Sequence, residues 1–132
     1  MSAELYWLAL TATMTALFFL PYVLNRISIR GLFGAMSNPR QGDLPESDWA
    51  QRAMKAHANA VENLVVFGVL VLCAQAAGVS TAMTAFAGCL YFWARLVHYL
   101  VYTLGVPIAR TLAFFAGFAA QLIVAFELLA AF

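Results

Sequence analysis

The chain has 132 residues, of which 64% are hydrophobic and 10% are charged, and its formal net charge is +1. An ordinary soluble domain is about 45–50% apolar and about 25% charged, so this composition indicates a membrane protein with room for a single domain, residues 1–132. The small net charge and the lack of a basic run argue against a nucleic-acid surface.

Hydropathy predicts an all-α protein that crosses the membrane four times. The first helix is expected over about residues 4–25, because the run from Leu5 to Leu24 can cross roughly 30 Å of hydrocarbon. A signal peptide would begin with positive charge, whereas Glu4 is acidic, so we expect this helix to be retained. The other helices are expected at about 48–77, 81–104 and 107–131, separated by turns at residues 78–80 and 105–107.

The segment 26–48 is expected to be the only long loop, because it is rich in glycine and proline. Most basic residues fall in this loop or at the start of the second helix, and the turn at 78–80 and both termini have none. The positive-inside rule then places the loop in the cytoplasm and both termini outside. Cys73 and Cys89 lie in apolar segments without zinc-type spacing, so no metal site is expected.

Two polar stripes interrupt the apolar helices. The first consists of Arg52, Lys55, Asn59 and Glu62, and the second of Tyr91, Arg95, His98 and Tyr102. Each set shares one helix face at about 100° per residue. A charged side chain at membrane depth costs about 2.5–3.5 kcal/mol on insertion scales, so such groups are expected to have partners.

Counting outward from the turn at Val79 places Glu62 level with Arg95 in an antiparallel hairpin. We therefore predict that these two side chains form an ion pair. Both stripes could serve only as structural contacts between helices, which are common in membranes and contribute about 0.6–2 kcal/mol each. The full set, with Arg110 at the start of the fourth helix, has more donors than one ion pair needs and suits an anionic, peptide-like ligand.

The second helix resembles the signature of the MAPEG superfamily, the membrane-associated proteins in eicosanoid and glutathione metabolism. The resemblance lies in Arg52-Ala-Met-Lys55-Ala-His57-Ala-Asn59-Ala-Val-Glu62 and in Arg95-Leu-Val-His98-Tyr-Leu-Val-Tyr102, followed by Gly105-Val-Pro107-Ile-Ala-Arg110-Thr111. Asn38-Pro39, eight residues after Arg30, also fits. The match covers nearly the whole chain and is of the bacterial type.

The resemblance implies a four-helix membrane bundle that forms a homotrimer and binds glutathione as thiol co-substrate between subunits, at the cytoplasmic side. It implies that Arg30, Lys55 and His98 hold the carboxylates and backbone of glutathione, that Asn59 and Glu62 receive its amide or amino groups, and that Tyr102 supports it. The complete candidate binding set is Arg30, Arg52, Lys55, Asn59, Glu62, Arg95, His98 and Tyr102.

Arg110 is the candidate catalytic residue, since a guanidinium in the first turn of a helix lies where the helix dipole also favours an anion. A free thiol titrates near 8.5. A lowered value would give a thiolate that attacks lipophilic electrophiles or hydroperoxides. Alternatively, Arg110 is an anchor at the cytoplasmic end of its helix.

The chain departs from other members at three positions. Ala58 stands where some members have Arg, Phe114 where some have Tyr, and Thr111 where Ser is sometimes found. The lost hydroxyl argues against a specific prostaglandin or leukotriene synthase activity. Lys55, where an Arg is expected, supplies a point charge instead of a bidentate fork.

Two functions remain open from the sequence. The first is a membrane-bound glutathione-dependent transferase or peroxidase acting on small lipophilic electrophiles. The second is a non-catalytic bundle that serves as an accessory subunit of a membrane complex. A transporter is disfavoured by the short chain without repeats. The expected location is a bacterial inner membrane, with the endoplasmic reticulum as the alternative.

Overall fold

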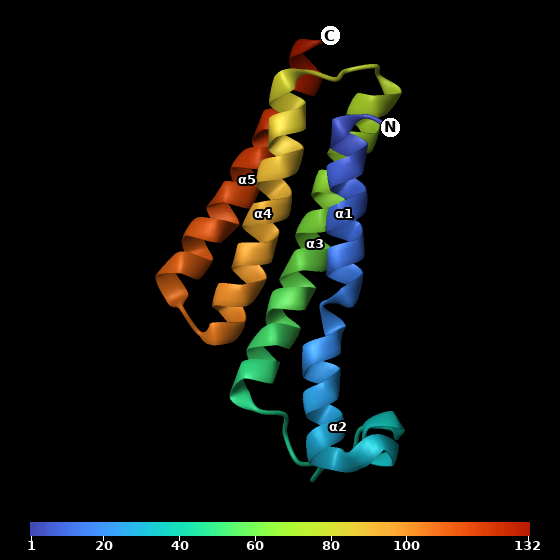
Figure 1. The fold of residues 1–132 in the computed structure, drawn as a ribbon, viewed down its shortest axis with the longest axis vertical. Coiled ribbons are helices and arrows are strands. Elements are labelled where there is room, and N and C mark those ends of the chain that lie inside the picture. Colours follow the sequence, from blue (N-terminus) through green and yellow to red (C-terminus); the bar gives the residue numbers. More distant parts are fainter.

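The computed structural model describes residues 1–132 and is all-helical. α1 and α2 follow each other end to end, so the five helices form a bundle of four rods (Figure 1). Both termini lie at one end of the bundle, and the loop between α2 and α3 lies at the other (Figure 1). The helices are α1 (Ala3–Leu17), α2 (Phe19–Met36), α3 (Asp48–Ala76), α4 (Ala82–Leu104) and α5 (Pro107–Ala130).

Three of the rods are long and apolar enough to cross a membrane: Ala3–Met36, α3 and α5. α4 has 23 residues but is not among these candidates, so the structure supports three of the four expected spans. Arg95 and His98 lower the hydropathy of α4, and both side chains are buried within the bundle. α4 packs against α1, α3 and α5.

The first rod is longer than expected, because the helix continues to Met36 where the sequence predicted a loop. Its axis kinks at Phe18, three residues before Pro21, which has no N–H to bond the carbonyl of Leu17. The Tyr99 hydroxyl donates to the Phe18 carbonyl at 2.8 Å. The kink is therefore held from α4.

Gly31 interrupts α2 near its end. Its φ of 73° and ψ of 166° are tolerated by glycine and strained for other residues. The last turn of α2 leaves the axis of the rod here and turns across the base of the bundle (Figure 1). Phe33 and Met36, in this turn, are exposed.

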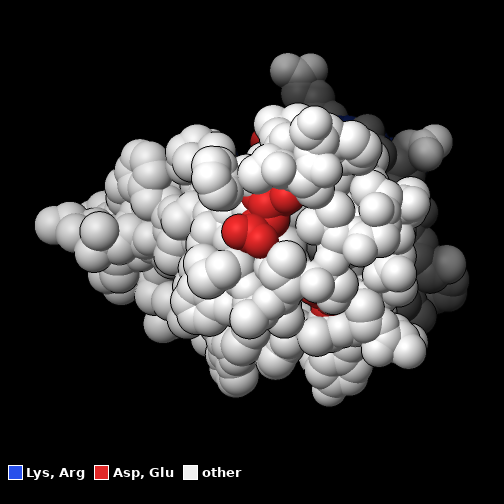
Figure 2. Space-filling model, turned by 90° about the horizontal axis from the view of Figure 1, so that it is seen from above, with Lys and Arg blue, Asp and Glu red and all other residues white.

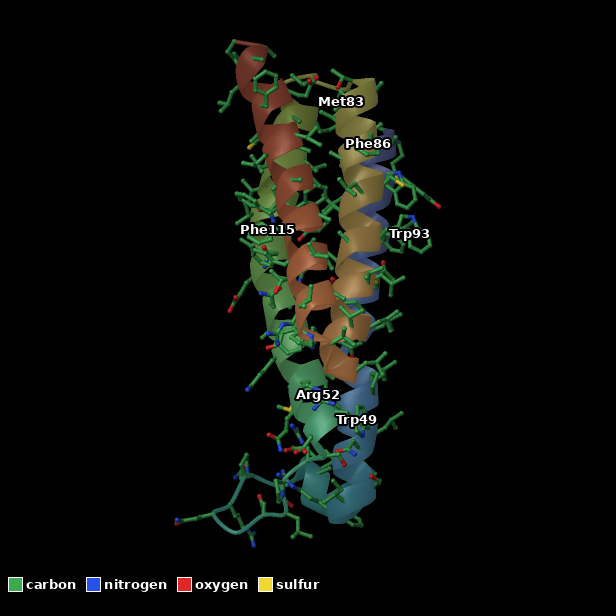
Figure 3. The ribbon with its side chains drawn as sticks, turned by 90° about the vertical axis from the view of Figure 1, so that its left-hand side faces the viewer. Trp49, Arg52, Met83, Phe86, Trp93 and Phe115 are labelled. Carbon is green, nitrogen blue, oxygen red and sulfur yellow. The ribbon has the colours of Figure 1, made fainter.

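Small residues let α3 approach its neighbours closely. Ala50, Ala53, Ala56 and Ala60 form one face of α3, and none is more than 2% exposed. Farther along, Phe67 stacks on Tyr91 with ring centroids 3.8 Å apart. Large apolar side chains point outward instead, including Met83, Phe86 and Trp93 on α4 and Phe115 on α5 (Figure 3).

The end that carries the termini holds acidic groups without basic partners. Figure 2 looks onto this end and shows acidic side chains among uncharged ones. Glu4 is 3% exposed, and its Oε1 accepts hydrogen bonds from Thr84 at 2.5 Å and Ser80 at 3.0 Å. Thr81 donates to Glu127 at 2.8 Å. These contacts tie α1 and α5 to the start of α4.

Candidate functional site

A pocket of about 320 Å³ opens among α3, α4 and α5 near the turn that joins α4 to α5. We call it the α4–α5 pocket. Three of its lining residues are hydrophobic, and the others carry hydrogen-bonding groups. Its lining consists of Asn59, His98, Tyr102, Arg110, Thr111, Phe114 and Phe115. It brings together four of the residues that the sequence proposed.

Arg110 lies over the ring of Tyr102, with its Cζ 4.5 Å from the ring centroid. Cations are attracted to aromatic faces in this geometry, so Tyr102 orients the guanidinium beside the pocket. Pro107 starts α5, and Arg110 lies in the first turn. A guanidinium and the positive end of a helix dipole thus lie together, and both favour an anion.

Behind the pocket, Arg95 is 1% exposed and donates from Nη2 to Asn59 Oδ1 at 2.6 Å. The same Nη2 lies 3.4 Å from Nδ1 of His98. Arg95 does not line the pocket, whereas Asn59 and His98 do. The guanidinium therefore contacts two of the lining residues from the protein side.

The expected ion pair between Glu62 and Arg95 is absent, because Arg95 bonds Asn59 instead. Glu62 lies three residues after Asn59, which puts it about 60° farther around α3 and away from α4. It lines a separate recess of about 430 Å³ with Tyr22, Met54, His57, Ala58 and Val61. In this recess, the Tyr22 hydroxyl lies 2.7 Å from His57 Nδ1.

The polar network extends toward mid-bundle, beyond the residues expected from the sequence. Asn63 donates to the Asn59 carbonyl at 2.9 Å, and Gln121, 7% exposed, donates to the Asn63 carbonyl at 3.3 Å. Gln121 was not among the candidate site residues. Asn63 lies one turn beyond Asn59, and that spacing was the available signal.

Arg52, a predicted ligand-binding residue, lines none of the hollows in the structure. Its Nε donates to the Thr103 carbonyl at 3.0 Å. Its guanidinium also packs on Gly105, where an added Cβ would lie 3.3 Å from Cζ. Arg52, near the loop end of α3 (Figure 3), thus holds the end of α4 and the turn that leads to Arg110.

Arg30 and Lys55 lie in a third hollow, a basin of about 470 Å³ under the α2–α3 loop. Arg30 donates to the Leu44 carbonyl at 2.8 Å and lies 3.5 Å from Glu46 Oε1. Arg26 donates to the same carboxylate at 2.7 Å. This hydrogen bond from Arg26 holds the pKa of the Glu46 carboxyl below its usual range.

The candidate residues are thus divided within one chain. The α4–α5 pocket is lined by Asn59, His98, Tyr102 and Arg110. The loop basin is lined by Arg30 and Lys55, and the separate recess by Glu62. Arg52 and Arg95 act from behind on other protein groups. No single hollow of the chain combines the expected ligand set.

Comparison with known proteins identifies the family of the chain. No curated protein matches the sequence. The model of the MAPEG family matches residues 5–130, which is nearly the whole chain, and it covers all of the hollows described above. The chain therefore belongs to the MAPEG family.

Proposed function

We propose that this protein is a membrane-bound, glutathione-dependent transferase or peroxidase acting on small lipophilic electrophiles. The observation that carries the proposal is the α4–α5 pocket, where Arg110 is held over Tyr102 next to Phe114 and Phe115. The guanidinium and the start of α5 would stabilise a glutathione thiolate. The thiolate would form a bond from sulfur to the electrophile, and the leaving group would depart.

We propose further that the active form is a homotrimer with the site between subunits. The division of the candidate residues supports this, because the loop basin and the Glu62 recess would need a second copy to meet the α4–α5 pocket. In such an assembly Lys55 and Glu62 of one subunit would hold the polar parts of glutathione near Arg110 of the next. The surrounding membrane is proposed to be a bacterial inner membrane, with the loop end in the cytoplasm.

Glutathione binding is the first test. A ligand that binds only the folded state stabilises it, by about 2.7 kcal/mol at 100 times its Kd. We expect millimolar glutathione to raise the unfolding temperature of the detergent-solubilised protein. S-methylglutathione, which has no free thiol, is the matched control ligand for binding without thiolate formation.

Arg110→Gln and Arg110→Lys separate binding from thiolate formation. In the Gln variant we expect the ultraviolet absorbance of bound thiolate to disappear at neutral pH, while S-methylglutathione still binds. Removal of one electrostatic donor of this kind typically costs about 10²–10³ in kcat. Arg110→Lys should retain part of the thiolate signal. Equal thiolate signals in wild type and the Gln variant would contradict the role of Arg110.

The second candidate is a non-catalytic member that acts as an accessory subunit. It is favoured by Phe114, which places an apolar ring where the pocket could have presented a hydroxyl. This candidate predicts no stabilisation by glutathione and no thiolate absorbance. The same two measurements therefore discriminate between the candidates.

A further inference from the structure

The buried guanidinium of Arg95 has no carboxylate partner. The structure's ion pairs join Arg26 and Arg30 to Glu46, at the loop end. Arg95 is 1% exposed, so its positive charge is offset only by neutral groups. A guanidinium has five N–H donors and no acceptor. Any side chain that bonds to it must therefore present a lone pair.

This requirement for a lone pair fixes the orientation of the Asn59 side-chain amide. Its Oδ1 accepts from Arg95 Nη2 at 2.6 Å, and Asn63 Nδ2 also approaches Oδ1 at 3.4 Å. An amide carries its acceptor and its donors on opposite branches. Because the oxygen is occupied, the Nδ2 group is what Asn59 can offer to a ligand in the α4–α5 pocket.

The same constraint fixes the tautomer of His98. Its Nδ1 lies 3.4 Å from the Arg95 Nη2 donor, and the ring is 2% exposed. A proton on Nδ1 would point an N–H at another N–H. Nδ1 must carry the lone pair, so the ring is neutral and its proton is on Nε2. His98 then has one donor for the pocket.

We infer that Arg95 is a positioning residue that sets the hydrogen-bonding polarity of the α4–α5 pocket through Asn59 and His98, without touching the ligand. Asn59 Nδ2, His98 Nε2 and the Arg110 guanidinium are then all donors. These three donors favour a ligand group that only accepts hydrogen bonds, such as a carboxylate or a thiolate. The identity of this ligand as a thiol peptide rests on the proposed function; the tautomer and the amide orientation do not.

The histidine tautomer is measurable because the chain has only two histidines. Protein with ¹⁵N-labelled histidine in detergent would give two ring spin systems, assigned with a His57→Gln variant. We expect His98 to be neutral with its proton on Nε2. In Arg95→Met, which keeps an unbranched side chain but removes its donors, we expect a substantial population of the Nδ1–H form. Arg95→Lys, which keeps a donor, should restore the Nε2–H form.

His57 is an internal control, since its Nδ1 lies 2.7 Å from the Tyr22 hydroxyl and the residue lines the Glu62 recess instead of the α4–α5 pocket. Its signals should be unchanged in both Arg95 variants and should move in Tyr22→Phe. A general loss of structure would instead move both histidines. Glutathione affinity should fall by about tenfold in Arg95→Met, as expected for misdirected hydrogen bonds, and recover in Arg95→Lys.

Two results would overturn the inference: a wild-type His98 that is protonated on Nδ1, or an Arg95→Met protein whose His98 remains entirely Nε2–H. The wild-type spectrum decides the first even if Arg95→Met does not fold. The predicted tautomers without any glutathione binding would support Arg95 as the positioning residue and refute the proposed function. Glutathione binding with the wrong tautomer would do the reverse.

Discussion

The hydroxyl of Tyr99 donates to the carbonyl of Phe18, and the two rings stack with centroids 3.8 Å apart. The bond meets a backbone group at the kink between α1 and α2, within an environment where Phe18 is 6% exposed. A typical intramolecular hydrogen bond contributes about 0.5–1.5 kcal/mol of net stability. The contact therefore fixes the kink and the two helices together.

Tyr99→Phe should lower the unfolding temperature, because it keeps the stacked ring and removes only the hydroxyl. We expect a loss of about 0.5–1.5 kcal/mol, the net contribution of a typical hydrogen bond. Thermal unfolding in detergent measures it. Tyr6→Phe is the matched control, since Tyr6 is 52% exposed and should have little effect. Equal stability of the two variants would show that the hydroxyl does not hold the kink.

Glu62→Gln should leave the stability of the ligand-free protein nearly unchanged, within about 0.5 kcal/mol, because Glu62 is exposed and does not pair with Arg95. Asn59→Leu should destabilise it by about 1–3 kcal/mol, because Arg95 loses its shortest hydrogen bond. Comparing the two melting curves checks the register of α3 against α4. A larger loss of stability in Glu62→Gln than in Asn59→Leu would instead support the ion pair between Glu62 and Arg95 that the sequence predicted.

Thr84→Val should destabilise the end of the bundle that carries the termini. The substitution preserves shape but removes the donor that lies 2.5 Å from Glu4 Oε1. Hydrogen bonds to charged groups contribute about 1.5–3 kcal/mol. The double variant Glu4→Gln and Thr84→Val should be less destabilised than the sum of the single variants. Additivity in this double-mutant cycle would show that the two side chains are not coupled.

The α2–α3 loop should open in acid. Because the pKa of folded Glu46 is lowered, its contacts with Arg26 stabilise the loop above about pH 4.3, the ordinary glutamate value, and are lost as the pH falls through the folded pKa. Pepsin cleavage within residues 37–47 should rise over that range. Glu46→Gln should already be sensitive at higher pH, whereas Asp43→Asn, in the same loop, should keep the wild-type profile.

Two inactive variants should complement each other if the site lies between subunits. Arg110→Gln alone and Lys55→Gln alone should each impair every site. Co-expression should produce mixed oligomers in which some sites combine an intact Arg110 with an intact Lys55. Conjugating activity should then exceed that of the two variants mixed after separate purification. The absence of any gain would argue that each site belongs to one chain.

The helix bounds of α3, α4 and α5 could be predicted because glycine and proline mark their ends, as at Gly78, Gly105 and Pro107. The extent of α2 could not, because Gly31 and the nearby polar residues resemble a loop, although the chain resumes a helical turn after the kink at Gly31. Helix periodicity predicted the polar stripes. It could not resolve the 60° between Asn59 and Glu62, which decides which of them meets Arg95.

The family resemblance was enough to name the residues of the candidate site, but it did not predict the role of each one. Arg52 binds the Thr103 carbonyl and Arg95 binds Asn59, so both act on the protein itself. A sequence motif records which residues recur and not which atoms they contact. The buried Gln121 shows the same limit, because a single polar residue on an apolar helix gives no sign of its partner.

The length of the kinked first rod has a consequence for access to the site. Residues 3–30, which precede the turn at Gly31, extend about 42 Å as helix, whereas the hydrocarbon of a bilayer is roughly 30 Å thick. The basic residues at the loop end favour placing much of the excess there, among headgroups and water. The α4–α5 pocket, with Arg110 in the first turn of α5 and Phe115 exposed on its outer side, would then border two solvents. A charged thiol could enter the pocket from water and a lipophilic substrate from the bilayer. Neither molecule would then have to pass through the environment of the other.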